Sequence, residues 1–358
     1  MLIMPNLFKD MLKDSESLFK NPIALDYDYQ PKLIPYRDNE QHYIASCIKP
    51  LLQDRNGKNL FIFGKPGVGK TVATKHVLQD LEENHDGVQQ IYINCWKKDT
   101  PYKVVLDVCE QIGYKWIQQK KTEELFQKVK EVLNKTSTLF VLDEADKLQD
   151  TSIIYSIIED IYKKTILLIT NEKDWINTID KRLLSRLVPE LLEFKPYNQE
   201  ETKEILKQRA QYAFNQNIFE EKAFNSIAEE TFRLQDIRTG LFLLKESALI
   251  AENKSLKKIK LEHSEEAIKK LATFTSKDEK HLQEDEKQIL ELIKGNSGKS
   301  IKDLYSIYSL NNSLAYRTFQ KKIKQLETAK QITLKDHKDG WGYYKTVEFG
   351  SLKTLDGY

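Results

Sequence analysis

The stretch GKPGVGKT at residues 64–71 constrains the fold of this chain more than any other feature. It fits the pattern G-x-x-x-x-G-K-[ST], it follows the apolar run NLFIFG, and a helical pattern comes directly after it. In that position the glycines let backbone N–H groups turn toward phosphate oxygens, and the positive end of the helix stabilises the negative charge. The alternative is a glycine turn without a ligand, and the flanking strand and helix argue against it. The stretch therefore predicts a phosphate-binding loop.

Two residues of this loop have distinct expected roles. The expected cofactors are ATP or ADP with Mg²⁺. Lys70 is expected to reach the β- and γ-phosphates of ATP, and Thr71 is expected to bind Mg²⁺. The predicted cofactor-binding residues of the loop are Gly64, Lys65, Pro66, Gly67, Val68, Gly69, Lys70, Thr71 and Val72.

A second motif, LFVLDEAD at residues 139–146, supplies two adjacent carboxylates at the end of an apolar run. Asp143 is placed for the Mg²⁺ shell, and Glu144 is placed to polarise a water toward the γ-phosphate. Either carboxylate alone would be an ordinary solvated strand end. After a phosphate-binding loop, the pair predicts an ATPase with a catalytic glutamate.

Five apolar runs alternate with helical patterns in the first part of the chain. They lie at 59–64, 89–95, 138–143, 165–171 and 190–197. Most are continuous rather than alternating, which is typical of strands buried on both faces of a parallel sheet. The sequence therefore predicts an α/β nucleotide-binding domain over residues 1–197.

The remainder of the chain reads differently. An all-helical domain is expected over 198–275, a polar linker over 276–285 and a third domain over 286–358. Within the third domain we expect helices at 286–294, 300–308 and 314–329, followed by two short strands. No run of about 18 apolar residues occurs in the sequence, so no transmembrane helix and no membrane partner are expected.

Further polar residues are candidates for the nucleotide site. Asn171 follows a predicted strand at the edge where ligands of open sheets bind, and it could orient the attacking water or only cap a turn. Arg182 and Arg186 are candidates for an arginine finger acting on a neighbouring subunit, although a structural salt bridge is an equal alternative. Arg238 begins an amphipathic helix from which it could fold over the nucleotide.

The net charge of +2 is unevenly distributed. Residues 299–345 contain ten basic and four acidic residues, so this segment carries +6 and the remainder −4. A basic C-terminal module on a mildly acidic body favours a nucleic-acid partner. The three cysteines show no CxxC spacing, so disulfides are not expected. We therefore expect the protein in a reducing compartment, the cytoplasm.

The last predicted helix divides into two faces. Ala315, Phe319, Ile323 and Leu326 fall within an arc of roughly 80°. The opposite face carries Arg317, Lys321, Lys324 and Thr328. Such a helix can pack on its own domain while presenting cations to DNA, and an ordinary solvated lysine face is the alternative.

A hairpin is expected after this helix, with strands QITL and YYKTVEF and a turn over residues 335–342. Lys335, His337 and Lys338 would lie at its tip and contact DNA. Trp341 either contacts DNA as well or packs beneath the hairpin, and both alternatives stay open.

Taken together, these motifs resemble the AAA+ ATPases of the archaeal origin-recognition type, which are related to the eukaryotic origin recognition complex. The loop at 64–71, LDEAD, Asn171 and Arg238 are similar to the Walker A, Walker B, sensor 1 and sensor 2 motifs of that family. TIDKRLLSRL resembles its post-sensor segment and places the finger at Arg182. The stretch QPKLIPYRDNEQHYIASCIKPLL is similar to the family's adenine-packing segment, which implies roles for Tyr36, Arg37 and Glu40.

The resemblance implies an AAA+ base with a five-stranded parallel sheet, a helical lid and a C-terminal winged-helix domain. It also implies an ATP-dependent replication initiator that binds origin duplex DNA, hydrolyses ATP slowly, self-associates on DNA and helps to load the replicative helicase. A nucleoid-associated location in the cytoplasm follows from that role.

The segment at 100–125 departs from the family, because KWIQQKKT stands where a Pro/Gly-containing DNA-contacting insertion would end. If contact persists there, Lys115, Gln118, Lys120 and Lys121 are the candidates. Two other functions fit the motifs. One is a P-loop signalling or defence switch whose winged helix binds no DNA, and the other is a clamp-loader-like or transposition-associated ATPase.

Overall fold

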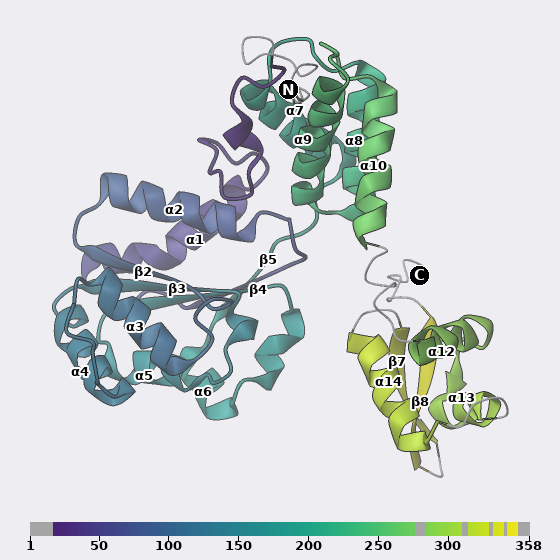
Figure 1. Cartoon of the computed structure of the whole chain (residues 1–358). Helices are drawn as coiled ribbons and strands as arrows, with labels where there is room; N and C mark the ends of the chain where they lie inside the picture. Colours follow the sequence, from purple (N-terminus) through teal and green to yellow (C-terminus); the bar gives the residue numbers. More distant parts are fainter. Residues whose placement is uncertain (1–16, 276–283, 310–313, 329–331, 340–341, 350–358) are drawn as a thin grey trace, which may run out of the picture. The chain divides into compact units, whose positions relative to one another are not determined.

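The computed structural model describes residues 17–275, 284–309, 314–328, 332–339 and 342–349 (Figure 1). The chain divides into two compact units, residues 1–268 and 269–358, which are described separately below. In the described part of the chain, no helix combines the length and the apolar character needed to cross a bilayer.

The first unit is built on a parallel sheet of five strands, as the sequence predicts. The strands are β1 (Leu60–Phe63), β2 (Val88–Asn94), β3 (Ser137–Asp143), β4 (Lys164–Thr170) and β5 (Glu190–Glu193). Their order is β2-β3-β4-β1-β5, and every neighbouring pair is parallel. The interior strands β1, β3 and β4 are buried almost throughout, which explains their continuous apolar sequences. Edge strand β5 is shorter than predicted, and it alternates between half-buried and exposed residues.

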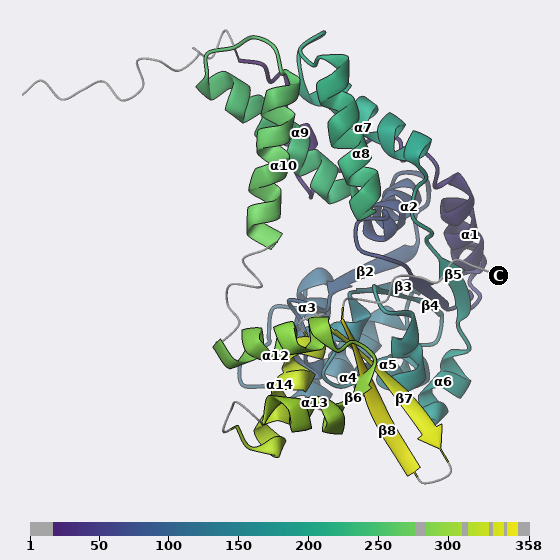
Figure 2. The same ribbon diagram turned by 90° about the vertical axis from the view of Figure 1, so that its right-hand side faces the viewer.

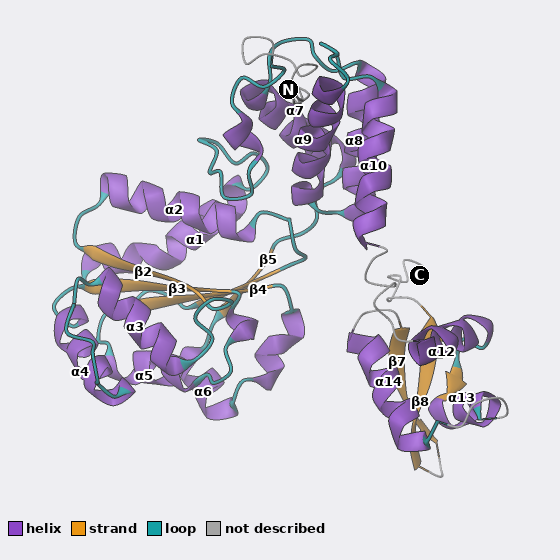
Figure 3. Ribbon diagram, viewed as in Figure 1, coloured by secondary structure: helices purple, strands orange, loops and turns teal. Residues whose placement is uncertain are grey.

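Helices cover both faces of this sheet (Figure 3). One face carries α1 (Asp38–Ile48) and α2 (Lys70–Asn84). The other face carries α3 (Pro101–Gln111), α4 (Thr122–Leu133), α5 (Ser152–Asp160) and α6 (Lys181–Leu187). Leu60 and Ile62 pack toward the first layer, and Phe61 and Phe63 pack toward the second, so alternate residues of β1 serve two cores.

The strand order determines where the functional side chains meet. Because β4 lies between β1 and β3, the end of β4 lies between the phosphate-binding loop and the carboxylates that end β3. The carboxyl ends of all five parallel strands meet at one edge of the sheet. Asn171, directly after β4, is thereby brought to the centre of that edge.

Four helices follow the sheet within the predicted all-helical segment. They are α7 (Gln199–Ala213), α8 (Glu221–Leu234), α9 (Ile237–Asn253) and α10 (Leu261–Thr275). Asn198 and Glu201 form a capping box that starts α7 just after Pro196. The N-terminal segment packs on this bundle, since the Arg209 guanidinium donates to the carbonyls of Ala24 and Tyr29.

Beyond the end of α10, the described part of the second unit forms helices and a small antiparallel sheet (Figure 2). The elements are α12 (Glu284–Gly295), β6 (Lys299–Ser300), α13 (Ile301–Tyr308), α14 (Tyr316–Thr328), β7 (Ile332–Asp339) and β8 (Gly342–Phe349). The sheet order is β6-β8-β7, and Phe319, Ile323 and Leu326 of α14 are buried in its core. This element order agrees with the one expected for the winged-helix domain that the sequence resemblance implies.

Several details of the prediction for this unit are wrong. The predicted turn over 335–342 is mostly strand, and the short strand β6 is missing from the prediction. Lys335, His337 and Lys338 lie within β7, paired with Thr346, Tyr344 and Tyr343 of β8. Beyond the short pairing with β6, β7 and β8 form a two-stranded ribbon that needs no continuous apolar face. The charged residues of this ribbon therefore resemble a loop in the sequence. Ala315, predicted for the apolar face of the last helix, precedes α14 and is exposed. Lys322 is buried on the inner face of α14, and its Nζ atom lies 3.8 Å from Oδ2 of Asp285.

The side chains of Lys335, His337 and Lys338, whose DNA contacts are predicted, lie outside the described part of the structure, and two further predictions fall on residues that are not described at all. They are the DNA contact of Trp341 and most of the linker, residues 276–283. Residues 284 and 285 of the predicted linker belong to α12.

Candidate functional site

The phosphate-binding loop surrounds a buried ammonium group. The Nζ atom of Lys70 donates hydrogen bonds to the carbonyls of Gly64 (2.7 Å) and Lys65 (2.9 Å), and to Oδ1 of Asn171 (2.8 Å). Only 6% of the Lys70 surface is exposed, and this burial lowers the pKa of its ammonium to about 8. The loop thus places a poorly solvated positive charge where phosphates are expected.

The glycines of the loop are required by its backbone geometry. Gly67 and Gly69 adopt φ values of 75° and 93°, which residues with a side chain rarely reach. Gly69 immediately precedes α2, so the helix N-terminus and its free N–H groups point at the loop. These features match an anion-binding helix start.

Asp143 collects three hydrogen bonds at the end of β3. Its Oδ2 atom accepts from the Thr71 hydroxyl at 2.9 Å and from the Tyr92 phenol at 2.5 Å. Its Oδ1 atom accepts from the backbone N–H of Glu144 at 3.0 Å. A hydroxyl and a carboxylate in contact are hard oxygen donors that suit Mg²⁺, so Thr71 and Asp143 fit the metal predicted for them.

Asn171 connects the two halves of the site. Its amide nitrogen donates to Oε2 of Glu144 at 2.8 Å, while its oxygen accepts from Lys70. Glu144 itself has a left-handed backbone, with φ of 56°, which turns the chain sharply after the strand. The structure therefore brings Lys70, Asn171 and Glu144 into one hydrogen-bonded chain.

The Arg37 side chain braces the loop from the protein interior. Its Nε atom donates to the Val68 carbonyl at 3.1 Å, and its Nη2 atom donates to the Lys195 carbonyl at 2.6 Å. Its guanidinium carbon lies 3.9 Å from the centre of the Tyr197 ring. Arg37 is 5% exposed, so its guanidinium is committed to protein groups and positions the loop backbone.

The neighbours of Arg37 complete this segment. Oε1 of Glu40 forms an ion pair with Nη1 of Arg37 at 2.9 Å, so these two residues of the predicted adenine-packing segment contact each other. Tyr36 is 43% exposed and has a left-handed φ of 62°, whereas the neighbouring Arg37 is buried.

The start of helix α9 reaches the phosphate-binding loop. Lys65 donates to Oε1 of Gln235 at 2.5 Å. A Cβ atom placed on Gly67 would lie 1.9 Å from Oδ1 of Asp236, so this carboxylate packs directly on the loop. Asp236 also caps α9 through the N–H of Arg238. The positive charge of Arg238 also acts to lower the pKa of Lys70.

Gln235 and Asp236 were missed by sequence reasoning. Their only signal is their position directly before Arg238 in QDIR, because a loop-to-lid contact depends on the folded arrangement of distant segments.

The two arginines of α6 differ in their contacts. Arg186 pairs with Glu159, and its guanidinium lies over the Tyr155 ring at 5.4 Å. Arg182 is exposed, and no acidic side chain within the described residues pairs with it. Arg186 therefore forms a structural salt bridge, whereas Arg182 is exposed at the surface.

Cationic side chains also gather on α14. Arg317, Lys321 and Lys324 are exposed on the face opposite the buried side chains. The helix thus has the two faces that the sequence predicts for a DNA-contacting helix.

The divergent segment between α3 and α4 presents an exposed aromatic residue. Trp116 is 78% exposed, and Lys115, Gln118 and Lys121 beside it are exposed. Lys120 is half-buried, and its ammonium contacts the Tyr114 hydroxyl.

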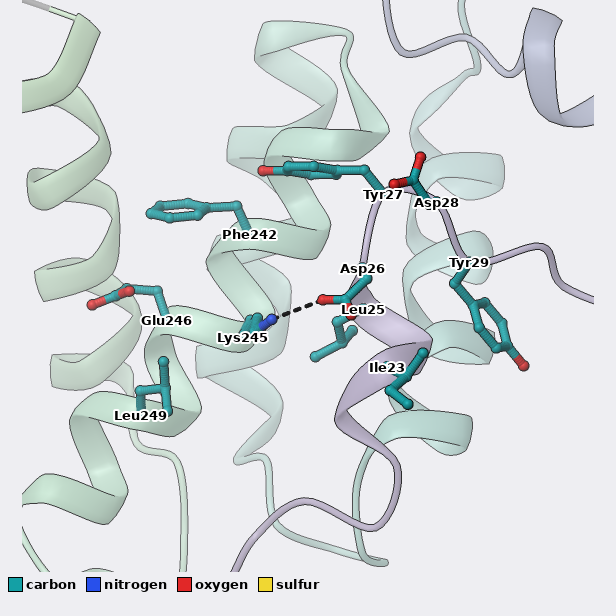
Figure 4. A pocket seen from close by; sticks show the side chains of 10 residues that line it. All are labelled: Ile23, Leu25, Asp26, Tyr27, Asp28, Tyr29, Phe242, Lys245, Glu246 and Leu249. Carbon is teal, nitrogen blue, oxygen red and sulfur yellow. Dashed lines mark hydrogen bonds and ion pairs between the residues drawn. The ribbon is translucent and has the colours of Figure 1, made fainter.

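A separate cleft of about 670 Å³ lies between the N-terminal segment and α9 (Figure 4). Tyr27 and Phe242 line one end of it, and Lys245 forms an ion pair with Asp26 at 2.8 Å. None of the predicted nucleotide-binding residues lines this cleft.

Comparison with known proteins places the chain in a family. Residues 53–174 match the AAA domain family, and residues 203–269 match the Cdc6 AAA+ ATPase-type lid domain. In fold, the chain is similar to the ORC1 protein of Aeropyrum pernix, solved in complex with DNA. That match has a TM-score of 0.71, 24% identity and 94% coverage of both chains. The ORC2 protein of Aeropyrum pernix gives a TM-score of 0.67 at 17% identity, covering 93% of this chain and 94% of that one.

Sequence relatives are closer than these structures. The ORC1-type DNA replication protein 1 of Archaeoglobus fulgidus is 31% identical over 287 residues, which cover 75% of this chain and 69% of the relative. The protein of the same description from Sulfurisphaera tokodaii is 33% identical over 263 residues, covering 70% and 66%. The chain therefore belongs to the family of ORC1-type DNA replication proteins and is an AAA+ ATPase with a Cdc6-type lid.

Proposed function

We propose that this protein is an ATP-dependent replication initiator that recognises origin duplex DNA through its C-terminal unit. The observation that carries the proposal is the division of α14 into a buried apolar face and an exposed basic one. A helix of this kind, with a shorter helix before it and a hairpin after it, can present cations to the major groove. Relatives described as DNA replication proteins, and a similar fold solved with DNA, support this proposal.

ATP hydrolysis is assigned to the network at the edge of the sheet. The loop from Gly64 to Val72 binds the phosphates, with Lys70 supplying positive charge, and Thr71 and Asp143 hold Mg²⁺. Bound Mg²⁺ supplies charge neutralisation at the phosphates. Glu144 acts as the base that polarises the attacking water, and Asn171 fixes the Glu144 carboxylate in orientation.

The lid is proposed to sense which nucleotide is bound. The start of α9 touches the loop through Gln235 and Asp236, and Arg238 follows Asp236 by two residues in the first turn of α9. A γ-phosphate would attract Arg238, whereas its loss would remove that attraction. ATP and ADP would then favour different lid positions, and these change the pose of the DNA-binding surfaces.

Hydrolysis is proposed to be slow in a single subunit because the arginine finger comes from a neighbour. Arg182 fits this role, since it is exposed and Arg186 is held by Glu159. Self-association on DNA would bring Arg182 to the next subunit's γ-phosphate. The replicative helicase is the proposed downstream partner.

The first prediction concerns the catalytic base. Glu144→Gln keeps the shape of the side chain and its position beside Asn171 but removes the basic carboxylate. Turnover is expected to fall by about 100- to 10,000-fold while ATP affinity stays near the wild-type value. Steady-state ATPase assays and nucleotide titrations measure the two effects. Glu172→Gln, an exposed carboxylate next to Asn171, is the matched control and should leave both unchanged. Wild-type turnover in Glu144→Gln would remove Glu144 from its role.

The second prediction concerns the basic face of α14. Arg317→Ala/Lys321→Ala removes two exposed cations one helical turn apart. The slope of log affinity for duplex DNA against log salt should become shallower by about 2. Lys203→Ala/Lys207→Ala removes an exposed pair at the same spacing on α7 and should leave the slope unchanged. Absence of duplex binding by the wild type at low salt would contradict the initiator and favour a switch ATPase.

The third prediction tests the finger by complementation. Arg182→Ala and Glu144→Gln should each be inactive alone, and mixing them should restore turnover, because one subunit keeps an intact site and the other an intact finger. Arg182→Ala should lower turnover by about 1,000-fold in the DNA-bound assembly, measured by phosphate release. Arg186→Ala serves as the control and should retain activity. A mixture no more active than its components would contradict catalysis in trans.

A further inference from the structure

Tyr92 on β2 contacts the carboxylate of Asp143 on the neighbouring strand. Asn94 is the register partner of Asp143, and Tyr92 lies two residues before Asn94, so both side chains emerge on the same face of the sheet. The Tyr92 phenol spans this diagonal and donates to Oδ2 of Asp143 at 2.5 Å. The motifs that identify the site do not include this residue.

The ring of Tyr92 is held on more than one side. The Lys75 ammonium lies 5.0 Å from the centre of the ring, and Lys75 follows Thr71 by one turn of α2. The ring also packs against the buried cluster between the sheet and the helices α1 and α2. The phenol oxygen therefore has little freedom to leave Asp143.

We propose that Tyr92 is a positioning residue that orients the Asp143 carboxylate toward Thr71 and thereby sets the Mg²⁺ requirement of nucleotide binding and ATP hydrolysis. Oδ2 accepts from Tyr92 on the β2 side and from Thr71 on the loop side, while Oδ1 accepts from the Glu144 N–H. Because both carboxylate oxygens accept hydrogen bonds from three donors, rotation of the carboxylate is restricted. The inference rests on the proposed roles of Thr71 and Asp143 in holding Mg²⁺.

Loss of the phenol should therefore act through the metal. In Tyr92→Phe the ring and its packing remain, but Oδ2 keeps only the Thr71 donor and the carboxylate can turn away. Partners of this kind, which orient a metal ligand without touching the metal, typically change metal affinity or activity by 10- to 100-fold. A role in packing alone would predict no change in the response to Mg²⁺.

The test is a titration of a fluorescent ATP analogue at increasing Mg²⁺ on the full chain. Tyr92→Phe should need about 10- to 100-fold more Mg²⁺ for half of the metal-dependent gain in affinity. Affinity in excess EDTA should equal that of the wild type. Saturating Mg²⁺ should return turnover to near the wild-type level, because the missing bond orients a ligand and performs no chemical step.

Tyr43→Phe is a matched control. The Tyr43 phenol donates to a carboxylate of Glu190 at 3.2 Å, and its ring packs on the same buried cluster. Glu190 is the first residue of β5, at the end of that strand opposite the carboxyl edge where the loop lies. Tyr43→Phe should leave the Mg²⁺ requirement unchanged. A wild-type Mg²⁺ requirement in Tyr92→Phe, or an equal loss of affinity in EDTA and in Mg²⁺, would overturn the inference.

Asp143→Asn separates this failure from failure of the proposed site. If Asp143→Asn raises the Mg²⁺ requirement and Tyr92→Phe does not, only the role of Tyr92 is wrong. If neither variant raises it, the assignment of Asp143 to Mg²⁺ is wrong, and the inference is overturned with it.

Discussion

The nucleotide site depends on the hydrogen bonds that the Lys70 ammonium donates. This ammonium joins the loop after β1 to Asn171 after β4, and Asn171 in turn holds Glu144 after β3. This chain of contacts requires the strand order in which β4 separates β1 from β3. Burial makes the charge costly, which lowers the pKa of Lys70, and anionic phosphates would offset that cost. The binding site is thus prepared by the same contacts that align the catalytic carboxylate.

Much of the fold follows directly from the sequence, because buried parallel strands have continuous apolar runs. The five runs correspond to β1 to β5, and the loop and LDEAD lie at the strand ends where they were expected. The basic and apolar faces of α14 also follow from helical periodicity. The ribbon of β7 and β8 was less predictable, because its charged residues pair through the backbone and carry no alternating apolar signal.

The supporting contacts of the site could not be read from local patterns. The Arg37 guanidinium bonds the carbonyl of Val68, the Tyr92 phenol bonds Asp143, and the Asp236 carboxylate packs on Gly67. Each joins residues far apart in sequence, so only the folded arrangement shows it. Sequence motifs thus identify the groups that meet the nucleotide, while the structure adds the residues that hold those groups in place.

If the lid senses the nucleotide state and thereby controls DNA binding, the affinity for DNA must depend on the bound nucleotide. The direct measurement is the affinity for duplex DNA at fixed salt with ATP and with ADP, for the wild type and for Arg238→Ala. The two wild-type affinities should differ by about 5-fold or more, and they should converge in Arg238→Ala. Equal wild-type affinities with ATP and ADP would contradict this control of DNA binding.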